Sequence, residues 1–257
     1  MNITFLGTGT SSGIPIIGCD CPVCMSANPK NKRLRSSILV EADGVYLVVD
    51  TAPDFREQAL RYRIPRVDAV LFTHAHADHV FGFDDIRRFN TIQGARIPAY
   101  GAPETINDLR RIFSYIGMNP KTKGLYRPDI EYHAVDNRFK IGDIFVEPLP
   151  VEHGGIATFG YVFEHLEKTV GYFPDCHEMS PAVIEKLRGI DIMILDALRY
   201  REHRTHLTVE ASIAILKQIG AHSSYMTHMC HDVDHDELED SLPTGMHVSY
   251  DGLVLTL

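Results

Sequence analysis

The sequence lacks an apolar run that approaches the roughly 20 residues of a membrane-spanning helix. Residues 1–6 also lack the basic stretch that opens a secretory signal peptide, and they have the pattern of a strand that runs straight into glycines. Repeats with periods of about 20–50 residues, low-complexity tracts and linkers are missing as well. These absences predict a single cytoplasmic domain over residues 1–257, without a membrane partner and with a substantial buried core.

The chain also has fewer positively charged than negatively charged residues. The chain has 25 Lys and Arg residues against 34 Asp and Glu residues, which gives a formal net charge of −9. Because nucleic-acid phosphates repel a negative chain, we do not expect DNA or RNA as a partner. The folded protein should be less acidic than this count, since bound metal would neutralise several Asp residues. Five Cys in a chain without a signal peptide indicate metal or redox use rather than a disulfide framework.

A phosphate-binding glycine motif is missing too. The glycine-rich stretch 7–13 does not have the G-x-G-x-x-G spacing, and Ile14-Pro15 follows where a helix should begin. We therefore expect a tight turn that carries the chain past a metal site.

Hydrophobic periodicity predicts strands and helices in a mixed order. The expected strands are 2–6, 37–41, 45–49, 67–72, 130–135, 144–149, 158–164, 169–173, 191–195, 224–227 and 253–256. The expected helices are 54–63, 103 to a stop at Gly117, 180–187 and 208–220, while 117–129 is irregular and contains Lys121, Lys123 and Arg127. Hairpins alternate with βα units in both halves, which predicts an α/β fold: an αββα four-layer sandwich of two mixed sheets with outer helices.

Residues 73–79, Thr-His-Ala-His-Ala-Asp-His, hold the densest set of metal-ligand side chains and directly follow the predicted strand 67–72. In an extended segment His74 and His76 point to the same side. If a helix begins near His79, Asp78 and His79 can reach a second metal. Mixed imidazole and carboxylate ligands suit Zn, Mn or Fe rather than Ca or Mg. The alternative is a polar loop that is merely rich in His. Three His and an Asp so close together have little physical use other than metal binding.

A two-metal centre needs further ligands at the ends of strands. His153, Asp175 and His228 each follow a predicted strand. A single His after a strand is more often a solvated or core residue, but the shared placement of the three favours them together.

A cysteine loop gives a separate signal. Cys19, Cys21 and Cys24 place three thiolates within six residues, one ligand short of a tetrahedral structural zinc. Cys21 and Cys24 alone could form a thioredoxin-like redox pair, but the βαβ context is missing. Cys230 and His231 are the two choices for the fourth ligand.

The order His74-x-His76-x-Asp78-His79, then His153, Asp175 and His228, resembles the metallo-β-lactamase superfamily. The stretches Leu6-Gly7-Thr8-Gly9-Thr10 and Asp50-Thr51-Ala52-Pro53-Asp54 are also similar to that family. The resemblance implies two divalent metal ions (Mn²⁺, Zn²⁺ or Fe), bridged by Asp175, with three further ligands each: His74, His76 and His153 for one, and Asp78, His79 and His228 for the other.

The cysteine loop together with Thr227-His228-x-x-His231 resembles the PhnP-type cyclic phosphodiesterases. That resemblance implies one structural Zn²⁺ held by Cys19, Cys21, Cys24 and His231, with Cys230 as a buried neighbour. Relatives in PQQ biosynthesis share the cysteine loop but have a degraded His motif, whereas here the motif is intact.

His206 lies two residues before Thr208, the expected N-cap of a helix, and so beside the positive end of that helix, a natural anion pocket. By resemblance it matches an active-site His that contacts phosphate and assists the leaving oxygen. His203 is its nearest competitor, and a structural role for either is the alternative.

The resemblance implies hydrolysis of a small, in particular a cyclic, phosphodiester by a dinuclear metal-bound hydroxide, with Asp175 and His206 as catalytic residues. A homodimer is expected from family likeness alone. One alternative is a tRNA 3′-processing nuclease, but the long basic arm of that branch is missing and 117–129 is too short to replace it. The others are a thioester or lactone hydrolase and a non-catalytic, zinc-stabilised binding module.

Overall fold

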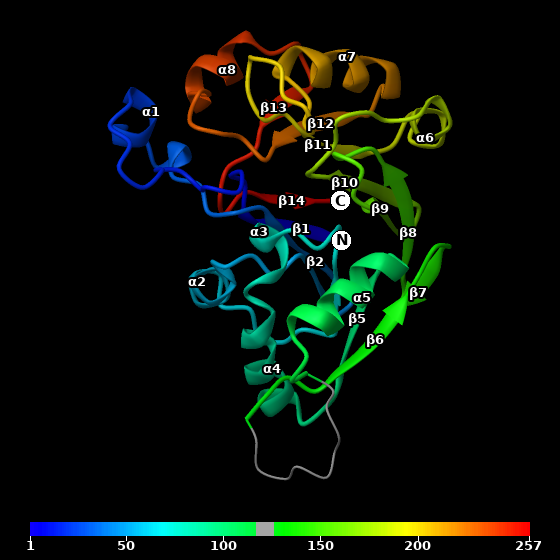
Figure 1. Ribbon diagram of the computed structural model, residues 1–257. Coiled ribbons are helices and arrows are strands. Elements are labelled where there is room, and N and C mark those ends of the chain that lie inside the picture. Colours follow the sequence, from blue (N-terminus) through cyan, green and yellow to red (C-terminus); the bar gives the residue numbers. More distant parts are fainter. Residues whose placement is uncertain (117–125) are drawn as a thin grey trace.

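The computed structural model describes residues 1–116 and 126–257, which contain two seven-stranded β-sheets (Figure 1). The first sheet has the order β14-β1-β2-β3-β4-β5-β6. Its strands are β1 (Asn2–Gly7), β2 (Ser37–Ala42), β3 (Val45–Val49), β4 (Ala69–Leu71), β5 (Ile97–Gly101), β6 (Ile130–Ala134) and β14 (Val254–Thr256). The second has the order β13-β12-β11-β10-β9-β8-β7. Its strands are β7 (Phe139–Ile141), β8 (Ile144–Val151), β9 (Thr158–His165), β10 (Lys168–Phe173), β11 (Ile192–Asp196), β12 (Ser223–Thr227) and β13 (Met246–Val248).

Both sheets are mixed in the same way. In the first, β14-β1-β2-β3 are antiparallel neighbours and β3-β4-β5-β6 are parallel neighbours. In the second, β7-β8-β9-β10 are antiparallel and β10-β11-β12-β13 are parallel. The parallel half of each sheet therefore brings the carboxyl ends of several strands to one edge, where sites are built in such sheets.

Helices cover the outer faces of the two sheets (Figure 1). The α-helices are α1 (Pro22–Met25), α2 (Phe55–Arg61), α3 (Ala77–Val80), α4 (Ile86–Gln93), α5 (Pro103–Ile112), α6 (Pro181–Lys186), α7 (Val209–Ile219) and α8 (His235–Ser241), with 3₁₀ turns η1 (Pro29–Asn31) and η2 (Phe83–Asp85). None of the helices within the described ranges is both long and apolar enough to cross a membrane.

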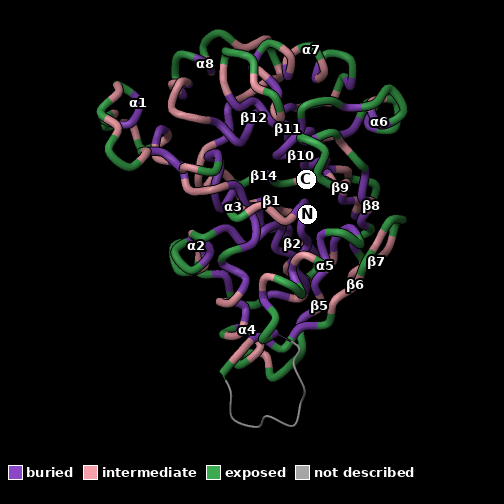
Figure 2. The backbone as a smooth tube through the Cα atoms, in the orientation of Figure 1, coloured by how far each residue is buried: buried purple, intermediate pink, exposed green. Residues whose placement is uncertain are grey.

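Three hydrophobic clusters separate these layers. Between the sheets lie fully buried side chains from both, such as Phe5, Val40 and Phe163. A second cluster joins the first sheet to α2, α4 and α5, and a third joins the second sheet to α6, α7 and α8. Figure 2 shows buried backbone along the strands and exposed backbone on the outer helices. The four-layer αββα prediction is confirmed, because burial occurs between sheets and under each helical layer.

Some elements were not predicted from the sequence. β7 and β13 have three residues each, too few for an alternating pattern, and β5 contains Pro98, which argues against a central strand. α4 buries only Ile86 and Phe89, and α8 is a short polar helix. The helix from Pro103 ends at Ile112, short of the expected stop. That stop, Gly117, lies outside the described residues, as do residues 118–125 of the segment expected to be irregular.

A buried arginine ties the amino-terminal third of the chain to its carboxyl end. Arg33 Nη1 donates to Thr8 Oγ1 (2.7 Å) and to the carbonyl of Ser249 (2.6 Å), and its Nη2 lies 3.2 Å from His235 Nδ1. Since a guanidinium can only donate, His235 must be neutral to accept this bond. Burial, with a further contribution from the charge of Arg33, lowers the pKa of His235 to about 4.

We expect acid to destabilise the fold through His235. Between about pH 6.5 and pH 4 the unfolded state binds a proton that the folded state excludes, so stability is lost as pH falls through this window, by about 1–2 kcal/mol. Urea unfolding at pH 7 and pH 4.5, with His235→Gln measured in parallel, checks this. A wild-type pH dependence no steeper than that of the variant would contradict it.

Candidate metal centre

The candidate ligands lie where strands of both sheets end. The motif of residues 74–79 follows β4 and continues into α3, while His153 follows β8, Asp175 follows β10 and His228 follows β12. Gly9 of the loop after β1 pairs with Met229, directly after His228, so the glycine turn passes the site as predicted. His228 itself has a φ of 60°, a left-handed backbone conformation that is uncommon for a residue other than glycine and is found at functional sites.

Three histidines form the first cluster. His74 Nε2 lies 2.8 Å from His76 Nδ1, and His153 Nε2 lies 3.3 Å from the same His76 nitrogen. The ligand atoms of the three all lie within 4.8 Å of one another. They are close enough to converge on one cation.

A carboxylate and two histidines form the second cluster. His79 Nε2 is 3.4 Å from Asp78 Oδ2, and His228 Nε2 is 3.8 Å from the same oxygen. Asp175 lies between the two clusters. Its Oδ2 is 3.1 Å from His79 Nε2, and its Oδ1 is 3.3 Å from His228 Nε2 and 3.7 Å from His153 Nε2. The structure thus brings together all seven residues that the resemblance assigned to the dinuclear centre.

Several of these polar atoms are buried without a hydrogen-bond partner in the described part of the chain: His79 Nε2, His228 Nε2 and Asp175 Oδ2. An unsatisfied buried polar group costs about 1–3 kcal/mol, so native folds rarely leave three together. Nitrogen and oxygen lone pairs that converge in this way fit divalent cations. The residues present therefore fit the metal ions that the fold implies.

The protonation states of His74, His153 and Asp175 suit metal binding. Burial lowers the pKa of His153 to about 4 and holds that of His74 well below its usual value, so both imidazoles keep a free lone pair. Burial alone would raise the pKa of Asp175, but His228 and His79 outweigh it and hold the pKa well below its ordinary range. Asp175 is therefore an anion between the two clusters.

Burial alone would lower the pKa of His79, but Asp175, Asp50 and Asp78 outweigh it and raise the pKa. A metal ion would therefore have to displace a proton from this ring.

Neighbouring groups orient the ligands. Asp50 Oδ2 lies 2.7 Å from His79 Nδ1 and accepts from Thr73 Oγ1 (2.8 Å), which in turn lies 3.0 Å from His74 Nδ1. The carbonyl of Thr205 accepts from His153 Nδ1 (2.8 Å). Such contacts fix the tautomer that turns the other ring nitrogen toward a metal. The sequence points to Asp50 only as part of a stretch that resembles the family, and nothing in the sequence marks a backbone carbonyl such as that of Thr205.

His206 lies beside both clusters but is not one of the expected metal ligands. Its Nδ1 is 2.7 Å from Asp196 Oδ2, its Nε2 is 3.9 Å from Asp175 Oδ1, and its ring stacks on that of His228 at 4.8 Å between centroids. Asp196, which ends β11, was not predicted to be a site residue. Its Oδ2 also accepts from the backbone N–H groups of Cys176 and Leu207.

One prediction about this segment needs correction. Thr208 does cap α7, but its Oγ1 accepts from Ala211 N–H, and Val209 N–H is bonded to the carbonyl of Arg199. Two of the N–H groups at this helix end therefore already have partners, which leaves the expected anion pocket with fewer free donors than an uncapped helix end. A contact between His206 and phosphate would come from its ring.

The cysteine loop and the segment after β12 meet on one side of the molecule, at α1 (Figure 1). His231 Nδ1 lies 3.2, 3.4 and 3.7 Å from the sulfur atoms of Cys19, Cys21 and Cys24. Burial raises the pKa of the Cys24 thiol to about 11, whereas the N–H of Cys24 is the main cause that lowers the pKa of Cys21 to about 7. Cys230 is half-buried rather than buried, and its sulfur accepts from Asp232 N–H. The four-atom cluster fits a tetrahedral Zn²⁺.

Replacing His231 by Ala is expected to remove one Zn²⁺ per chain and to lower Tm by several degrees, because metal affinity in such a site contributes directly to folding. Elemental analysis and thermal unfolding measure both effects. Cys230→Ser is the matched control, and it should keep the zinc. Zinc loss in the control but not in His231→Ala would contradict the assignment.

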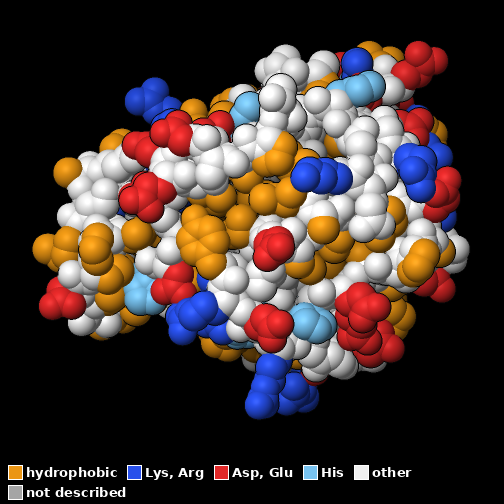
Figure 3. Space-filling model, turned by 90° about the horizontal axis from the view of Figure 1, so that it is seen from above, with side chains coloured by type: hydrophobic (Ala, Val, Ile, Leu, Met, Phe, Trp, Pro, Cys, Tyr) orange, Lys and Arg blue, Asp and Glu red, His pale blue; other side chains and the backbone are white. Residues whose placement is uncertain are grey.

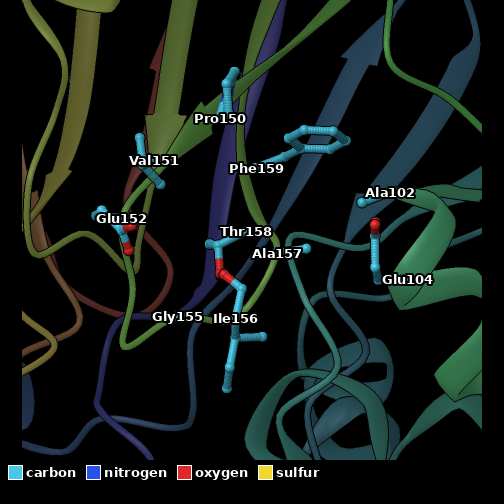
Figure 4. A pocket seen from close by; sticks show the side chains of 10 residues that line it. All are labelled: Ala102, Glu104, Pro150, Val151, Glu152, Gly155, Ile156, Ala157, Thr158 and Phe159. Carbon is cyan, nitrogen blue, oxygen red and sulfur yellow. The ribbon is translucent and has the colours of Figure 1, made fainter.

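Two cavities flank the centre. One, of about 350 Å³, is lined by His177, Glu202, His203, His206 and Thr208, among others. The other, of about 470 Å³, lies beside the loop that carries His153. Figure 4 shows Glu104, at the start of α5, facing this second cavity from one side and Glu152, just after β8, from the other, with Ile156 and Phe159 between them. The first cavity shares His206 with the site, so a substrate at the centre can extend in that direction.

Residues 46–229 match the family model described as the beta-lactamase superfamily domain, so the chain belongs to that superfamily and is a metal-dependent hydrolase. Within the superfamily it is similar to a crystallised diphosphatase of the PhnP family, with 40% identity, a TM-score of 0.91, and 100% of this chain and 97% of that chain covered. This similarity confirms the resemblance to the PhnP family.

Two other similar proteins differ from this chain in length or have a lower sequence identity to it. The chain is 35% identical over 257 residues to an octanoyltransferase of Porphyromonas gingivalis, covering 98% of this chain and 51% of that protein. It thus spans about half the length of this curated relative. Human tRNase Z, short form, is 17% identical with a TM-score of 0.74 over 100% of this chain and 99% of that chain, which shows a shared fold.

Proposed function

We propose that the chain hydrolyses small phosphoric diesters, cyclic phosphodiesters and diphosphate diesters included, at a dinuclear divalent-metal centre. The observation that carries the proposal is the position of His206. Asp196 holds its Nδ1, and its Nε2 faces Asp175 at 3.9 Å, next to the two ligand clusters. The diphosphatase activity named for the PhnP-family relative supports chemistry at phosphorus.

The two cations would be held by His74, His76 and His153 on one side and by Asp78, His79 and His228 on the other, with Asp175 shared. When bound, they would supply an activated water and neutralise charge on the phosphoryl oxygens. Mn²⁺, Zn²⁺ and Fe²⁺ all suit this donor set. A Zn²⁺ at Cys19, Cys21, Cys24 and His231 would be structural, because four protein ligands leave no open position.

His206 would move the proton. Its Nδ1–H is fixed on Asp196, so a proton that Nε2 takes from the attacking water would produce an imidazolium that the carboxylate stabilises. The same Nε2 then gives this proton to the leaving oxygen. Burial lowers the pKa of His206, which favours return to the neutral ring after the transfer.

The nuclease alternative has less support. The face seen in Figure 3 carries Lys and Arg side chains interspersed with Asp and Glu, rather than a continuous basic surface for tRNA. The sequence also lacks the basic, Gly-rich arm of that branch. Carbonyl hydrolysis stays an alternative outcome, since a curated relative is an octanoyltransferase.

The test is hydrolysis of bis(p-nitrophenyl) phosphate by chelator-stripped protein, titrated back with Mn²⁺ or Zn²⁺ and compared with a p-nitrophenyl monoester and a thioester. We expect turnover of the diester that stripping abolishes and metal restores. Turnover of the thioester alone would move the function to carbonyl hydrolysis. Metal-loaded protein that turns over none of the three would support a binding module.

A further inference from the structure

The cavity of about 350 Å³ begins where the metal centre ends. It shares His206 with the centre and continues past that ring to His203 and His177. The rings of His203 and His206 lie 5.1 Å apart between centroids. If His206 protonates the leaving oxygen, this cavity is on the side that receives the leaving group.

The tautomer of His203 is set by its own loop. Its Nδ1 accepts from the backbone N–H of Thr205 (3.3 Å) and lies 3.2 Å from Thr205 Oγ1. A neutral imidazole that accepts at Nδ1 carries its proton at Nε2. His203 Nε2 has no hydrogen-bond partner among the described residues and is not among the buried atoms. The side chain is half-buried and therefore presents an N–H donor at the cavity.

The loop around His203 is positively charged. Arg199 and Arg201 are fixed in place, the first by bonds to the carbonyls of 201 and 202, and the second by an ion pair with Asp232 at 2.7 Å. Arg204 is exposed on the same loop, and Glu202 is the one carboxylate among the residues that line the cavity. None of the three arginines lines the cavity itself, and Asp232 neutralises Arg201. With Asp232 and Glu202 both counted, the loop keeps one net positive charge, which favours an anionic occupant.

From these contacts we propose that the cavity is a subsite for a phosphate group on the leaving side of the substrate, with His203 Nε2–H as the donor that positions it. The inference rests on the proposed function and narrows it to diphosphate diesters. In the reaction, the water oxygen forms a bond to the attacked phosphorus and the bond from that phosphorus to the bridging oxygen breaks. The bridging oxygen leaves on the second phosphate and takes the proton from His206 Nε2.

His203 is thus a positioning residue, distinct in role from His206. Among the described residues, no hydrogen bond or ion pair joins His203 to Asp175 or Asp196, whereas His206 lies near both. Removing a donor to the second phosphate should weaken the binding of a substrate that has two phosphates. It should not change the binding of a substrate that has a single phosphate.

The experiment compares steady-state kinetics on ADP-ribose, a diphosphate diester, with those on bis(p-nitrophenyl) phosphate, which has a single phosphate. We expect His203→Ala and His203→Asn to raise KM for ADP-ribose about 10- to 100-fold, the range of one hydrogen bond to a charged group, and to leave the single-phosphate diester within about twofold. His203→Gln, whose amide nitrogen falls near the Nε2 position, should restore most of the loss. Glu202→Gln should lower KM for ADP-ribose about 2- to 5-fold by removing a like charge. His222→Gln, on an exposed histidine beyond α7, is the control.

Metal content is measured for every variant and should not change, and nitrogen-15 NMR of the histidine rings should show His203 as the Nε2–H tautomer. Equal losses on both substrates, or no loss on ADP-ribose, would overturn the subsite. So would a wild type that cleaves the single-phosphate diester but neither cleaves ADP-ribose nor is inhibited by it, while the proposed function would stand. A metal-loaded wild type inactive on both would overturn the proposed function itself.

Discussion

Replacing Asp175 by Asn is expected to lower kcat on bis(p-nitrophenyl) phosphate by at least about 10³-fold, because one carboxylate serves both ligand clusters. Its two oxygens lie 3.1 Å from His79 Nε2 and 3.3 Å from His228 Nε2, and the side chain is buried. An amide of the same shape removes the negative charge between the cations and offers one acceptor oxygen in place of two. Steady-state kinetics and metal-to-protein ratios measure the result, and the variant should hold fewer centre metals than the wild type.

The control for Asp175 is Asp143→Asn, on the exposed turn between β7 and β8, where Lys140 is the one ion-pair partner of the carboxylate within the described part of the chain. It should match the wild type in both readouts. Asp175→Asn protein that keeps both centre metals and near wild-type kcat would show that Asp175 does not bridge the clusters.

The ligands of the centre could be predicted because residue type and position in the strand pattern agree. His153, Asp175 and His228 each follow an apolar run, and the motif of residues 74–79 follows another. Carboxyl ends of strands collect at one edge of a mixed sheet, so four separate segments could be expected to meet without knowledge of their distances. The structure adds the distances and the buried, unsatisfied atoms.

The groups that orient these ligands were harder to predict for a physical reason. Asp50 also follows an apolar strand, yet its partner His79 is 29 residues away and the pairing depends on how β3 and β4 align. Asp196 carries the same signal at the end of β11, and a systematic reading of every Asp at a strand end would have found both. Thr205 contributes only its carbonyl to His153, which any residue could supply, so no side-chain signal exists.

The strands and helices could likewise be predicted where the signal is local in the sequence, and not where it depends on contacts with distant residues. The hairpin of β2 and β3 was predicted because its two short apolar strands and the Asp43-Gly44 turn between them are local, and both turn residues have positive φ. β5 was missed because Pro98 removes a backbone donor, and its place between β4 and β6 is fixed by those neighbours. Tertiary context therefore decided the elements whose own patterns are weak or contradictory.

The second large effect is expected from Asp196→Asn, which should lower kcat about 10²- to 10⁴-fold, the range that general acid–base catalysis contributes. Asp196 Oδ2 holds His206 Nδ1 at 2.7 Å and accepts from two backbone N–H groups, so the carboxylate itself is fixed. An asparagine can turn its amide nitrogen toward His206 and so favour the wrong tautomer, and it cannot stabilise an imidazolium. The effect should appear in kcat more than in KM, because substrate contacts remain.

A double-mutant cycle with His206→Ala separates a catalytic effect from a structural one. If Asp196 acts through His206, then Asp196→Asn should cost little further activity once His206 is gone, whereas independent effects would add. Asp196 Oδ1 also lies 4.0 Å from His228 Nδ1, so Asp196 could instead orient that ligand. Metal-to-protein ratios of the variants distinguish these two roles. Retained metals with a non-additive loss would assign Asp196 to proton transfer. Loss of a centre metal in the Asn variant would instead assign it to the orientation of His228, and loss of metal in His206→Ala would make His206 a ligand. The proton step proposed for it would then be wrong.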